Sequence, residues 1–519
     1  MKGCVIMSVP YVKKDQKGIA TLYINDEPFF CRAGEIHNSG ASDPEYMNEH
    51  VWPALRGLHM NSVIVPVYWE LIEPEEGHYD LSSVRSLICQ AREEDMKLIF
   101  LWFGLWKNAE SMYVPAWVKK DTKTFFRTEK INGDRMTTIS PLCKAAVEKD
   151  REAFTALMSF LREFDGEDNT VIMIQVENEI GLLGTDRDYC EAANAAFSEQ
   201  VPPLIEELTG CSGDWKGVFG DEAGEKFMAW QFACAVETIT ASGQKEYALP
   251  CYANAWLRQY PWYPGSYPSG GPVVESQEIW RKAAPSLFAF GPDIYVPYCA
   301  DVMDEYASSD NPLVIPEIRK DAVTASYALY AFGGKNAICY SPFGIEELSL
   351  DPSQIQSPPM EVMIALNIDP SAFNITDSAA YLSQVYHLLD ELEPLYLQYR
   401  GTPHLKAFIR HGEYDYGTML HFENYDIAVS YAPRADAKPL GAGIIIELEP
   451  DRFLLIGTRC TLRFMPKPGV EKTADILRLT EGTIEKGIWK QGRVLNGDEK
   501  MSLQFTDMPS AMMLEMYLY

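Results

Sequence analysis

An apolar run ends in acids and amides between residues 171 and 181, which read VIMIQVENEIG. Gln175, Glu177, Asn178 and Glu179 interrupt or follow β-branched and long aliphatic side chains. Burying a carboxylate is costly unless it is paired or hydrogen-bonded, so we interpret this strand end as a chemical site. A carboxyl group in apolar or acid-rich surroundings has a raised pKa and can act as a general acid.

A second carboxyl group, Glu317, ends the apolar run LVIPEIR at residues 313–319. Arg319 follows two residues later, and a cation in contact with Glu317 would favour its ionised form. One protonated and one ionised carboxyl group are what hydrolysis of a glycosidic bond requires. The sequence therefore favours Glu179 as the acid and Glu317 as the ionised partner.

Elements that could position these two residues recur along the chain as apolar, strand-like runs followed by helical patterns. We expect strands at 29–37, 61–70, 97–104, 169–177, 246–256, 291–298, 311–318 and 336–344. We expect helices at 45–60, 81–95, 142–164, 226–245, 321–335 and 379–401. Such repeats of apolar strand and helix predict an α/β fold, a (β/α)8 TIM barrel. A doubly wound sheet is the alternative, but no G-x-G-x-x-G or G-K-[ST] motif follows any of the strands.

The pattern of apolar and polar residues changes after the last of these helices. Short alternating strands separated by turn residues follow, for example TMLHFENYDIAVSYAP and GAGIIIELEPDRFLLIG. This pattern is typical of an antiparallel β-sandwich. We therefore expect a barrel domain over residues 1–400 and a β-sandwich accessory domain over residues 401–519.

Polar or aromatic side chains stand at every predicted strand end, where barrel enzymes carry their functional groups. Aromatic faces can cover the C–H face of a sugar, and acids and amides can bind its hydroxyl groups. The candidates for substrate binding are Glu35, Tyr68, Asn108, Asn178, Asn254, Trp256 and Tyr295. Strands four and seven face one another across the barrel, so Glu179 and Glu317 could approach to about 5–5.5 Å, the separation typical of retaining glycosidases.

Composition restricts the partners. The formal charge is −29 and no Lys/Arg block occurs, which argues against nucleic acids and anionic membranes. No apolar stretch reaches the ~18 residues of a membrane span, and the N-terminus does not read as a secretion signal. The 11 Cys are scattered and never spaced C-x-x-C, which indicates reduced thiols, a cytoplasmic location and no metal site. The expected partner is an oligosaccharide or glycoside, with assembly into a homo-oligomer as a further option.

Four segments together resemble glycoside hydrolase family 35 β-galactosidases: FFCRAGEIHNSGAS, VIVPVYWELIEPEEGHYDL, YVPAWVK and IQVENEIG. The resemblance covers roughly residues 20–350, and it extends to the wider clan of retaining barrel glycosidases with catalytic Glu on strands four and seven. The tail is similar to a small β-sandwich found after the barrel in a bacterial subgroup. The zinc cysteine cluster of family 42 is absent from the sequence.

The resemblance implies specific roles. Glu179 is expected to be the general acid/base and Glu317 the nucleophile, without a cofactor. Asn178 is expected to bind the sugar 2-hydroxyl, and Tyr295 to touch the nucleophile. The family usually carries an A-E-W triplet after strand three. This chain has WKNAESMYVPAW there, so Asn108 is expected to take over the role of that triplet.

The expected activity is removal of terminal β-galactosyl residues. Two alternatives stay open: a β-glucoside, β-xyloside or α-L-arabinopyranoside as substrate, or a non-catalytic carbohydrate-binding protein on the same fold.

Overall fold

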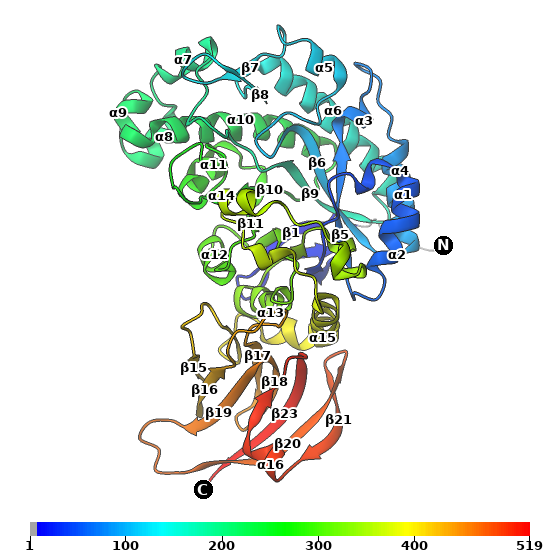
Figure 1. Cartoon of the computed structure of the whole chain (residues 1–519), viewed down its shortest axis with the longest axis vertical. Coiled ribbons are helices and arrows are strands. Elements are labelled where there is room, and N and C mark those ends of the chain that lie inside the picture. Colours follow the sequence, from blue (N-terminus) through cyan, green and yellow to red (C-terminus); the bar gives the residue numbers. More distant parts are fainter. Residues whose placement is uncertain (1–7) are drawn as a thin grey trace.

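A computed structural model describes residues 8–519 and contains the expected barrel (Figure 1). Eight parallel strands form its wall: β4 (Cys31–Arg32), β5 (Ser62–Tyr68), β6 (Lys97–Lys107), β9 (Val171–Asn178), β10 (Cys251–Trp256), β11 (Leu287–Ile294), β12 (Val314–Ile318) and β13 (Cys339–Pro342). Their order in space is β4-β13-β12-β11-β10-β9-β6-β5. The sheet closes because the Ile64 N–H donates to the Gly34 carbonyl (2.9 Å) and the Ile36 N–H to the Ile64 carbonyl (3.2 Å).

Both faces of the wall are covered, which explains why its strands read as apolar runs. Every residue of β5 and β9 is buried, as expected for a parallel sheet enclosed by helices. The main covering helices are α4 (Ser82–Glu93), α6 (Lys144–Asp165), α10 (Ala223–Glu246), α11 (Gln277–Ala283), α12 (Cys299–Tyr306), α13 (Thr324–Lys335) and α15 (Ser378–Tyr399). The TIM barrel predicted from the sequence is confirmed.

Several strand boundaries differ from expectation: the first strand, predicted at 29–37, is only Cys31–Arg32, and two further differences concern β10 and β11. The fifth strand, β10, begins at Cys251 instead of residue 246, because α10 continues to Glu246. The sixth strand, β11, spans Leu287–Ile294, four residues earlier than the predicted 291–298. Its Gly291 lies inside the strand, where a Cβ atom would come within 2.6 Å of the Val314 carbonyl oxygen of the neighbouring strand.

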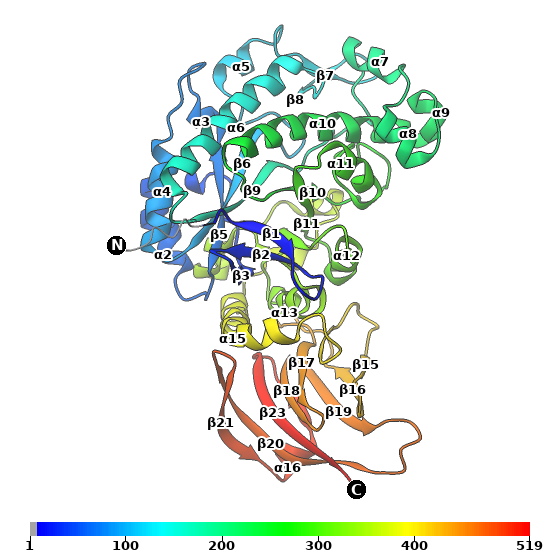
Figure 2. The same ribbon diagram turned by 180° about the vertical axis from the view of Figure 1, so that it is seen from behind.

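An antiparallel sheet that the sequence did not reveal precedes the barrel, formed by β1 (Tyr11–Lys14), β2 (Ala20–Ile24) and β3 (Glu27–Phe29) (Figure 2). Asn169, just before β9, donates to the Ser8 carbonyl (2.9 Å) and to Asn25 Oδ1 (2.7 Å). These contacts put the small sheet at the amino ends of the barrel strands. The carboxyl ends, where barrel sites form, lie at the opposite side.

Two antiparallel sheets make up the C-terminal part, and they form the expected β-sandwich. The larger sheet contains β14 (Leu405–Ile409), β17 (Ala442–Glu449), β18 (Arg452–Thr458), β23 (Ser510–Leu518), β20 (Ala474–Glu485) and β21 (Ile488–Leu495). The smaller contains β15 (Gly417–His421), β16 (Tyr425–Tyr431), β19 (Cys460–Pro466) and β22 (Leu503–Phe505). Buried residues such as Phe453, Leu455 and Tyr425 form the core of the sandwich.

The sandwich packs onto the barrel through α13 and α15 (Figure 1). Ile444 and Ile456 of the larger sheet belong to the same hydrophobic cluster as the barrel core. Ser326 Oγ on α13 donates to the Leu440 carbonyl (2.9 Å), and the Lys486 N–H donates to Glu391 on α15 (2.6 Å). Between residues 8 and 519 no helix is both long and apolar enough to cross a membrane.

Candidate active site

Glu179 owes its direction to a backbone break at the end of β9. Glu177 and Glu179 have φ angles of 62° and 46°, in the left-handed region that L-residues rarely adopt. The two carboxyl groups therefore separate. Glu177 turns into the barrel wall, where it accepts hydrogen bonds from the Leu105 N–H (3.1 Å) and the Trp106 N–H (2.6 Å). Glu179 instead lines a cavity at the barrel mouth.

Neighbouring strands hold the backbone of Glu179. Its N–H donates to Asn254 Oδ1 (2.8 Å), and its carbonyl accepts from the Ala109 N–H (3.1 Å). Asn254 in turn donates to Asp293 Oδ2 (2.6 Å). Hydrogen bonds from two adjacent β/α units thus hold the strained turn in a single arrangement.

Glu317 lies on β12 and lines the same cavity. The Tyr295 hydroxyl donates to its Oε2 (2.8 Å), and the Asn178 amide donates to its Oε1 (3.1 Å). Hydrogen bonds donated to a carboxylate stabilise its charged form. The two donors orient the oxygens of the Glu317 carboxyl group from both sides.

Burial and the neighbouring charge of Glu317 raise the pKa of Glu179 to about 8. Lys107 acts in the opposite direction but does not outweigh these two effects. The acid-rich surroundings expected for Glu179 come from Glu317 and not from Glu177. A protonated carboxyl group beside a hydrogen-bonded carboxylate is the pairing that general acid catalysis with a nucleophile requires.

Two further carboxyl groups lie close to this pair. Asp293 is paired in register with Glu317 on the adjacent strand, and burial followed by the charges of Glu317 and Glu179 raises its pKa strongly. Burial and the charge of Glu317 also raise the pKa of Glu35. Neither Glu35 oxygen has a hydrogen-bond partner among residues 8–519. Lys107 lies among these acids and donates to Asn178 Oδ1 (2.7 Å).

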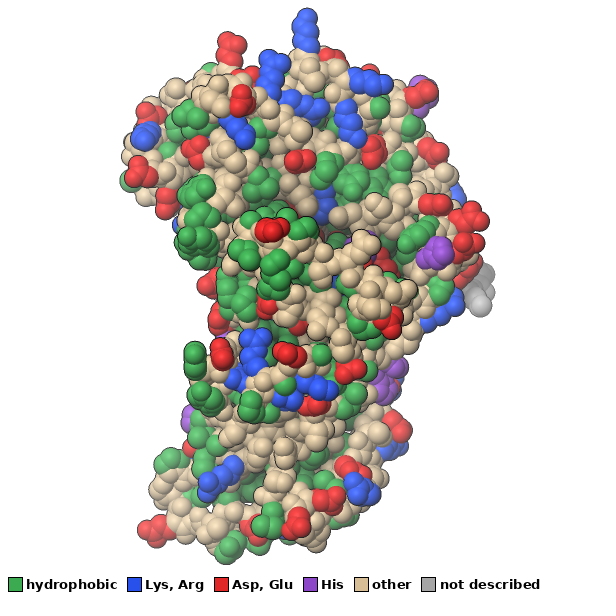
Figure 3. Space-filling view, in the orientation of Figure 1, with side chains coloured by type: hydrophobic (Ala, Val, Ile, Leu, Met, Phe, Trp, Pro, Cys, Tyr) green, Lys and Arg blue, Asp and Glu red, His purple; other side chains and the backbone are tan. Residues whose placement is uncertain are grey.

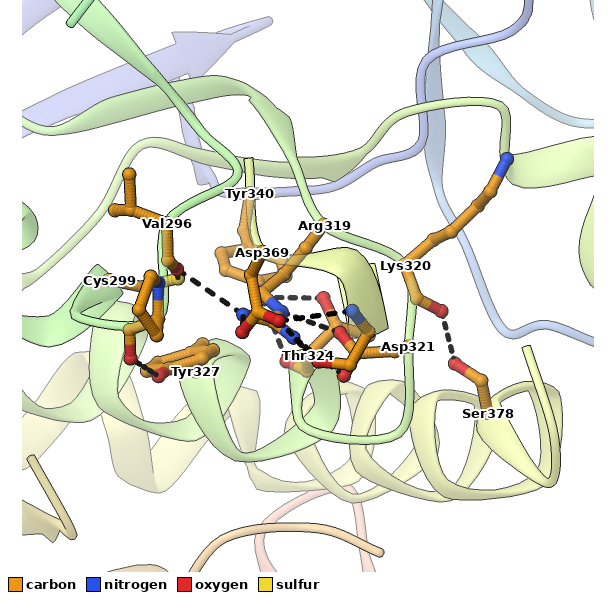
Figure 4. Close-up of polar contacts among 12 residues, drawn as sticks. Val296, Cys299, Arg319, Lys320, Asp321, Thr324, Tyr327, Tyr340, Asp369 and Ser378 are labelled. Carbon is orange, nitrogen blue, oxygen red and sulfur yellow. Dashed lines mark hydrogen bonds and ion pairs between the residues drawn. The ribbon is translucent and has the colours of Figure 1, made fainter. Parts of the chain in front are cut away.

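Arg319 does not contact Glu317. Figure 4 shows Arg319 directed towards Asp321 and Asp369, whereas Lys320 points the other way. Arg319 Nε lies 2.6 Å from Asp321 Oδ1, and Nη1 lies 2.7 Å from Asp369 Oδ2. Side chains alternate between the two sides of a strand, so residues two apart, such as Glu317 and Arg319, would point to the same side. Arg319, however, lies beyond the end of β12, where this alternation stops. The buried ion cluster connects the end of β12 to the loop that carries Asp369.

The cavity that Glu179 and Glu317 share has a volume of about 340 Å³. Of the predicted binding residues, Asn108, Trp256 and Tyr295 line it. Asn178 and Asn254 are fully buried. Asn178 is hydrogen-bonded to Glu317, and Asn254 to the backbone of Glu179. Glu35 is likewise fully buried. Tyr68 does not line the cavity. It packs against Phe103 and Tyr113, and its hydroxyl donates to the Asn38 carbonyl (2.7 Å).

Sequence reasoning missed several residues that line this cavity. They are His37, Asn38, Lys107, Leu257, Gln259, Asp293, Val296, Lys320, Phe343, Glu347, Gln356, Pro358, Leu366, Asn367, Ile368 and Phe373. Asp293 could have been found from the sequence, since it ends an apolar run. The prediction placed that strand, β11, four residues too late. The segment from Gln356 to Phe373 carried no such signal, because its helices, α14 (Met360–Ala365) and a 3-10 helix at Pro370–Phe373, are too short to show a periodic pattern. In the part of the chain described, no group of three His, Cys, Asp or Glu side chains is suited to hold a metal.

A larger cavity of about 930 Å³ lies beside the hairpin of β7 (Arg127–Glu129) and β8 (Arg135–Ile139) and the helix α7 (Glu191–Phe197). Neither Glu179 nor Glu317 lines it. Volume alone does not identify a site, and the paired carboxyl groups favour the smaller cavity as the centre of the chemistry.

Two family models match parts of the chain. Residues 21–243 match the family model of glycosyl hydrolases family 35, and residues 382–506 match a domain of unknown function, DUF5597. No curated protein matches the chain in sequence.

Solved structures resemble the chain at low sequence identity. A β-galactosidase from Bacillus circulans sp. alkalophilus is 13% identical over 71% of this chain and 57% of that one, with a TM-score of 0.49. A β-galactosidase from the psychrophilic Marinomonas ef1 is 14% identical over 70% and 60%, with a TM-score of 0.46. The catalytic domain of a β-amylase from Paenibacillus polymyxa is 11% identical over 66% and 99%, with a TM-score of 0.43. The chain thus spans less than two thirds of the length of these two β-galactosidases.

Proposed function

Because residues 21–243 match the family model of glycosyl hydrolases family 35, we propose that the chain is a retaining glycosidase that removes terminal β-galactosyl residues. The observation that carries this proposal is that Glu179 and Glu317 line one cavity at the carboxyl end of the barrel. The raised pKa of Glu179 and the two hydrogen bonds donated to Glu317 support different roles for the two groups.

The proposed reaction has two steps. First, a Glu317 oxygen attacks the anomeric carbon and forms an ester bond, while the glycosidic C–O bond breaks and the leaving oxygen takes the proton of Glu179. Glu179 is then ionised and accepts a proton from water, whose oxygen attacks the same carbon and breaks the ester bond. The sugar leaves with its anomeric configuration retained, and Glu179 is protonated again. Hydrolysis by this route needs no cofactor.

The sugar would be bound by side chains on several strand ends. Asn178, which already contacts Glu317, is proposed to bind the 2-hydroxyl. Asn108 and Trp256 line the cavity and are proposed to contact other hydroxyls and the C–H face of the ring. We retain Glu35, Asn254 and Tyr68 as predicted contributors, with Glu35 the strongest because its carboxyl group has no partner of its own among the described residues.

Another sugar is the second candidate, since Asn108 lines the cavity where family relatives carry an A-E-W triplet. A panel of aryl glycosides of galactose, glucose, xylose and arabinopyranose separates the specificities. We expect the highest kcat/KM for the β-galactoside. A higher value for another sugar would keep the two-glutamate chemistry and change the substrate.

Labelling with 2-deoxy-2-fluoro-β-galactosyl fluoride tests the mechanism. The fluorine at C2 slows both steps, and the good leaving group lets the covalent intermediate accumulate. Peptide mass spectrometry is expected to find the label on Glu317. A label on another carboxyl group would refute the assignment, and a sugar that binds without labelling would favour a non-catalytic carbohydrate-binding protein.

We also propose a cytoplasmic location. All ten cysteines among residues 8–519 are free thiols, which supports a reducing compartment. The ligand is proposed to be a glycoside or oligosaccharide, in agreement with the formal charge of −29, which disfavours polyanions.

A further inference from the structure

A second cavity, of about 290 Å³, adjoins the one that holds Glu179 and Glu317. Its lining comes from the loop after β10 and from α12, and it comprises Leu257, Arg258, Trp262, Val273, Val274, Glu275, Tyr298, Val302, Glu305 and Tyr306. None of these residues takes part in the proposed bond cleavage. The cavity therefore has no role in the chemistry derived above.

Two contacts connect the cavities. Leu257 lines both of them. Asn367, on the wall of the first, donates a hydrogen bond to the Tyr298 hydroxyl, on the wall of the second (3.3 Å). The walls of the two cavities therefore adjoin at Leu257 and at the contact between Asn367 and Tyr298.

The loop after β10 is attached to the segment that follows Glu179. The Leu182 N–H donates to the Ser269 carbonyl (3.0 Å), and the Gly184 N–H donates to the Gly265 carbonyl (2.7 Å). A Cβ atom on Gly181 would come within 2.6 Å of the Pro268 backbone, so the two segments are in close contact. Because the acid must reach the leaving oxygen, the side of the site next to Glu179 is the side on which the leaving group lies.

Aromatic side chains project from this loop into solvent. Tyr260, Trp262 and Tyr263 are 68%, 50% and 60% exposed. Figure 3 shows hydrophobic side chains gathered on this face, over the region where Figure 1 draws α11, α12 and α14 (Met360–Ala365). Neighbouring exposed aromatic rings are costly unless they serve a binding surface, and flat rings can cover the C–H face of a pyranose.

The charges of the second cavity favour a neutral ligand. Arg258 and Glu275 form an ion pair with an N–O distance of 2.7 Å, which leaves Glu305 as the other charged group of the lining. An anionic chain would be repelled by this carboxylate and by the net charge of the protein. The polar groups that remain, such as the Tyr298 hydroxyl, suit sugar hydroxyls.

We propose that the second cavity and the aromatic residues Tyr260, Trp262 and Tyr263 bind the leaving-group sugars of a neutral oligosaccharide. This inference rests on the proposed function and names its substrate class. The natural substrate is then a galactosyl oligosaccharide whose sugar units beyond the scissile bond reach the second cavity. The galactosyl unit occupies the first cavity and the next units occupy the second.

The test compares wild type with Trp262→Ala and Tyr260→Ala. For each protein, kcat/KM is measured on a galactosyl tri- or tetrasaccharide and on β-galactosyl fluoride, which has no leaving-group sugar. The ratio of the two values is expected to fall about 2- to 10-fold in each variant, in line with the loss of one stacked ring. Tyr519→Ala, which removes a 67% exposed tyrosine directly after β23 of the C-terminal sandwich, is the control and is expected to keep the wild-type ratio.

Two results would overturn the inference. One is an unchanged ratio in both variants. The other is an equal fall for 4-nitrophenyl β-galactoside relative to the fluoride, which would assign the surface to an apolar aglycone.

If wild type hydrolyses no glycoside, the proposed function fails, and calorimetric titration of the same proteins with the oligosaccharide decides the inference. Weaker binding by Trp262→Ala than by wild type supports it. Equal affinity, or binding by neither protein, overturns it.

Discussion

The Asn178 amide donates a hydrogen bond of 3.1 Å to the Glu317 carboxylate. The residue before the proposed acid therefore contacts the proposed nucleophile, although 139 positions separate them. Lys107 donates a hydrogen bond to Oδ1 of the same side-chain amide (2.7 Å). One side chain thus couples strands β6, β9 and β12 at the point where the anomeric carbon would lie.

Glu317→Gln is expected to reduce kcat for aryl β-galactosides by more than about 1,000-fold, because an amide oxygen is a poor nucleophile. The shape of the side chain is kept, so thermal unfolding should remain close to that of wild type. Glu515→Gln, in the sandwich strand β23, is the matched control and should retain full activity. Turnover by Glu317→Gln close to the wild-type rate would exclude this residue as the nucleophile.

Glu179→Ala is expected to separate substrates by their leaving groups. A dinitrophenyl leaving group needs no proton, so its galactoside should still form the glycosyl-enzyme, whereas a methyl or sugar leaving group should react very slowly. Azide, which needs no general base, should restore the second step and yield β-galactosyl azide. Unimpaired hydrolysis of a methyl galactoside by this variant would contradict the acid role.

The pKa of about 8 for Glu179 predicts the alkaline limit of activity. The first step needs Glu179 protonated, so kcat/KM should fall as the pH rises through about 8. The same profile recorded for Glu179→Ala on the dinitrophenyl galactoside should lack this fall. An alkaline limit that persists in the variant would assign the ionisation to another group.

Tyr295→Phe is expected to lower kcat about 10- to 100-fold, since a hydrogen bond to a charged group contributes about 1.5–3 kcal/mol. The lost bond is the one from the hydroxyl to Glu317 Oε2 (2.8 Å). Tyr327→Phe is the matched control, because it removes only a 3.4 Å contact with the Pro297 carbonyl. Equal kinetics for the two variants would show that Tyr295 does not act on the nucleophile.

Arg319→Met is expected to lower the free energy of unfolding by about 3–5 kcal/mol, because Asp321 and Asp369 would lose their buried cation. Arg56→Met breaks a surface pair with Glu94 and should cost much less. Chemical denaturation measures both. A loss for Arg319→Met no larger than that for Arg56→Met would show that the cluster does not hold the fold together.

The barrel and its two central acids could be predicted from the sequence because parallel strands enclosed by helices are apolar throughout. Such strands appear as uninterrupted runs, and an acid at the end of one is conspicuous. This is how Glu179 and Glu317 were selected, and both line one cavity. Their catalytic roles stay predictions.

Other parts of the site could not be predicted, for physical reasons. The predicted sixth strand starts at Gly291, whereas Gly291 lies within β11, where the backbone of β12 leaves no room for a side chain. That shift concealed Asp293. One partner of Arg319 is Asp369, which lies 50 positions away in the sequence. No local sequence pattern reveals such a contact.

The packing of α13 on the C-terminal sheets bears on how the molecule comes apart. A Cβ atom on Gly333 would lie 2.6 Å from the Ile444 side chain, so helix and sheet meet almost backbone to side chain. The helix follows β12, which carries Glu317, and detaching the sheets would leave its outer face bare to water. Heating should therefore produce one cooperative calorimetric transition, and a protease that cuts near Gly401 should inactivate the enzyme instead of liberating a competent barrel.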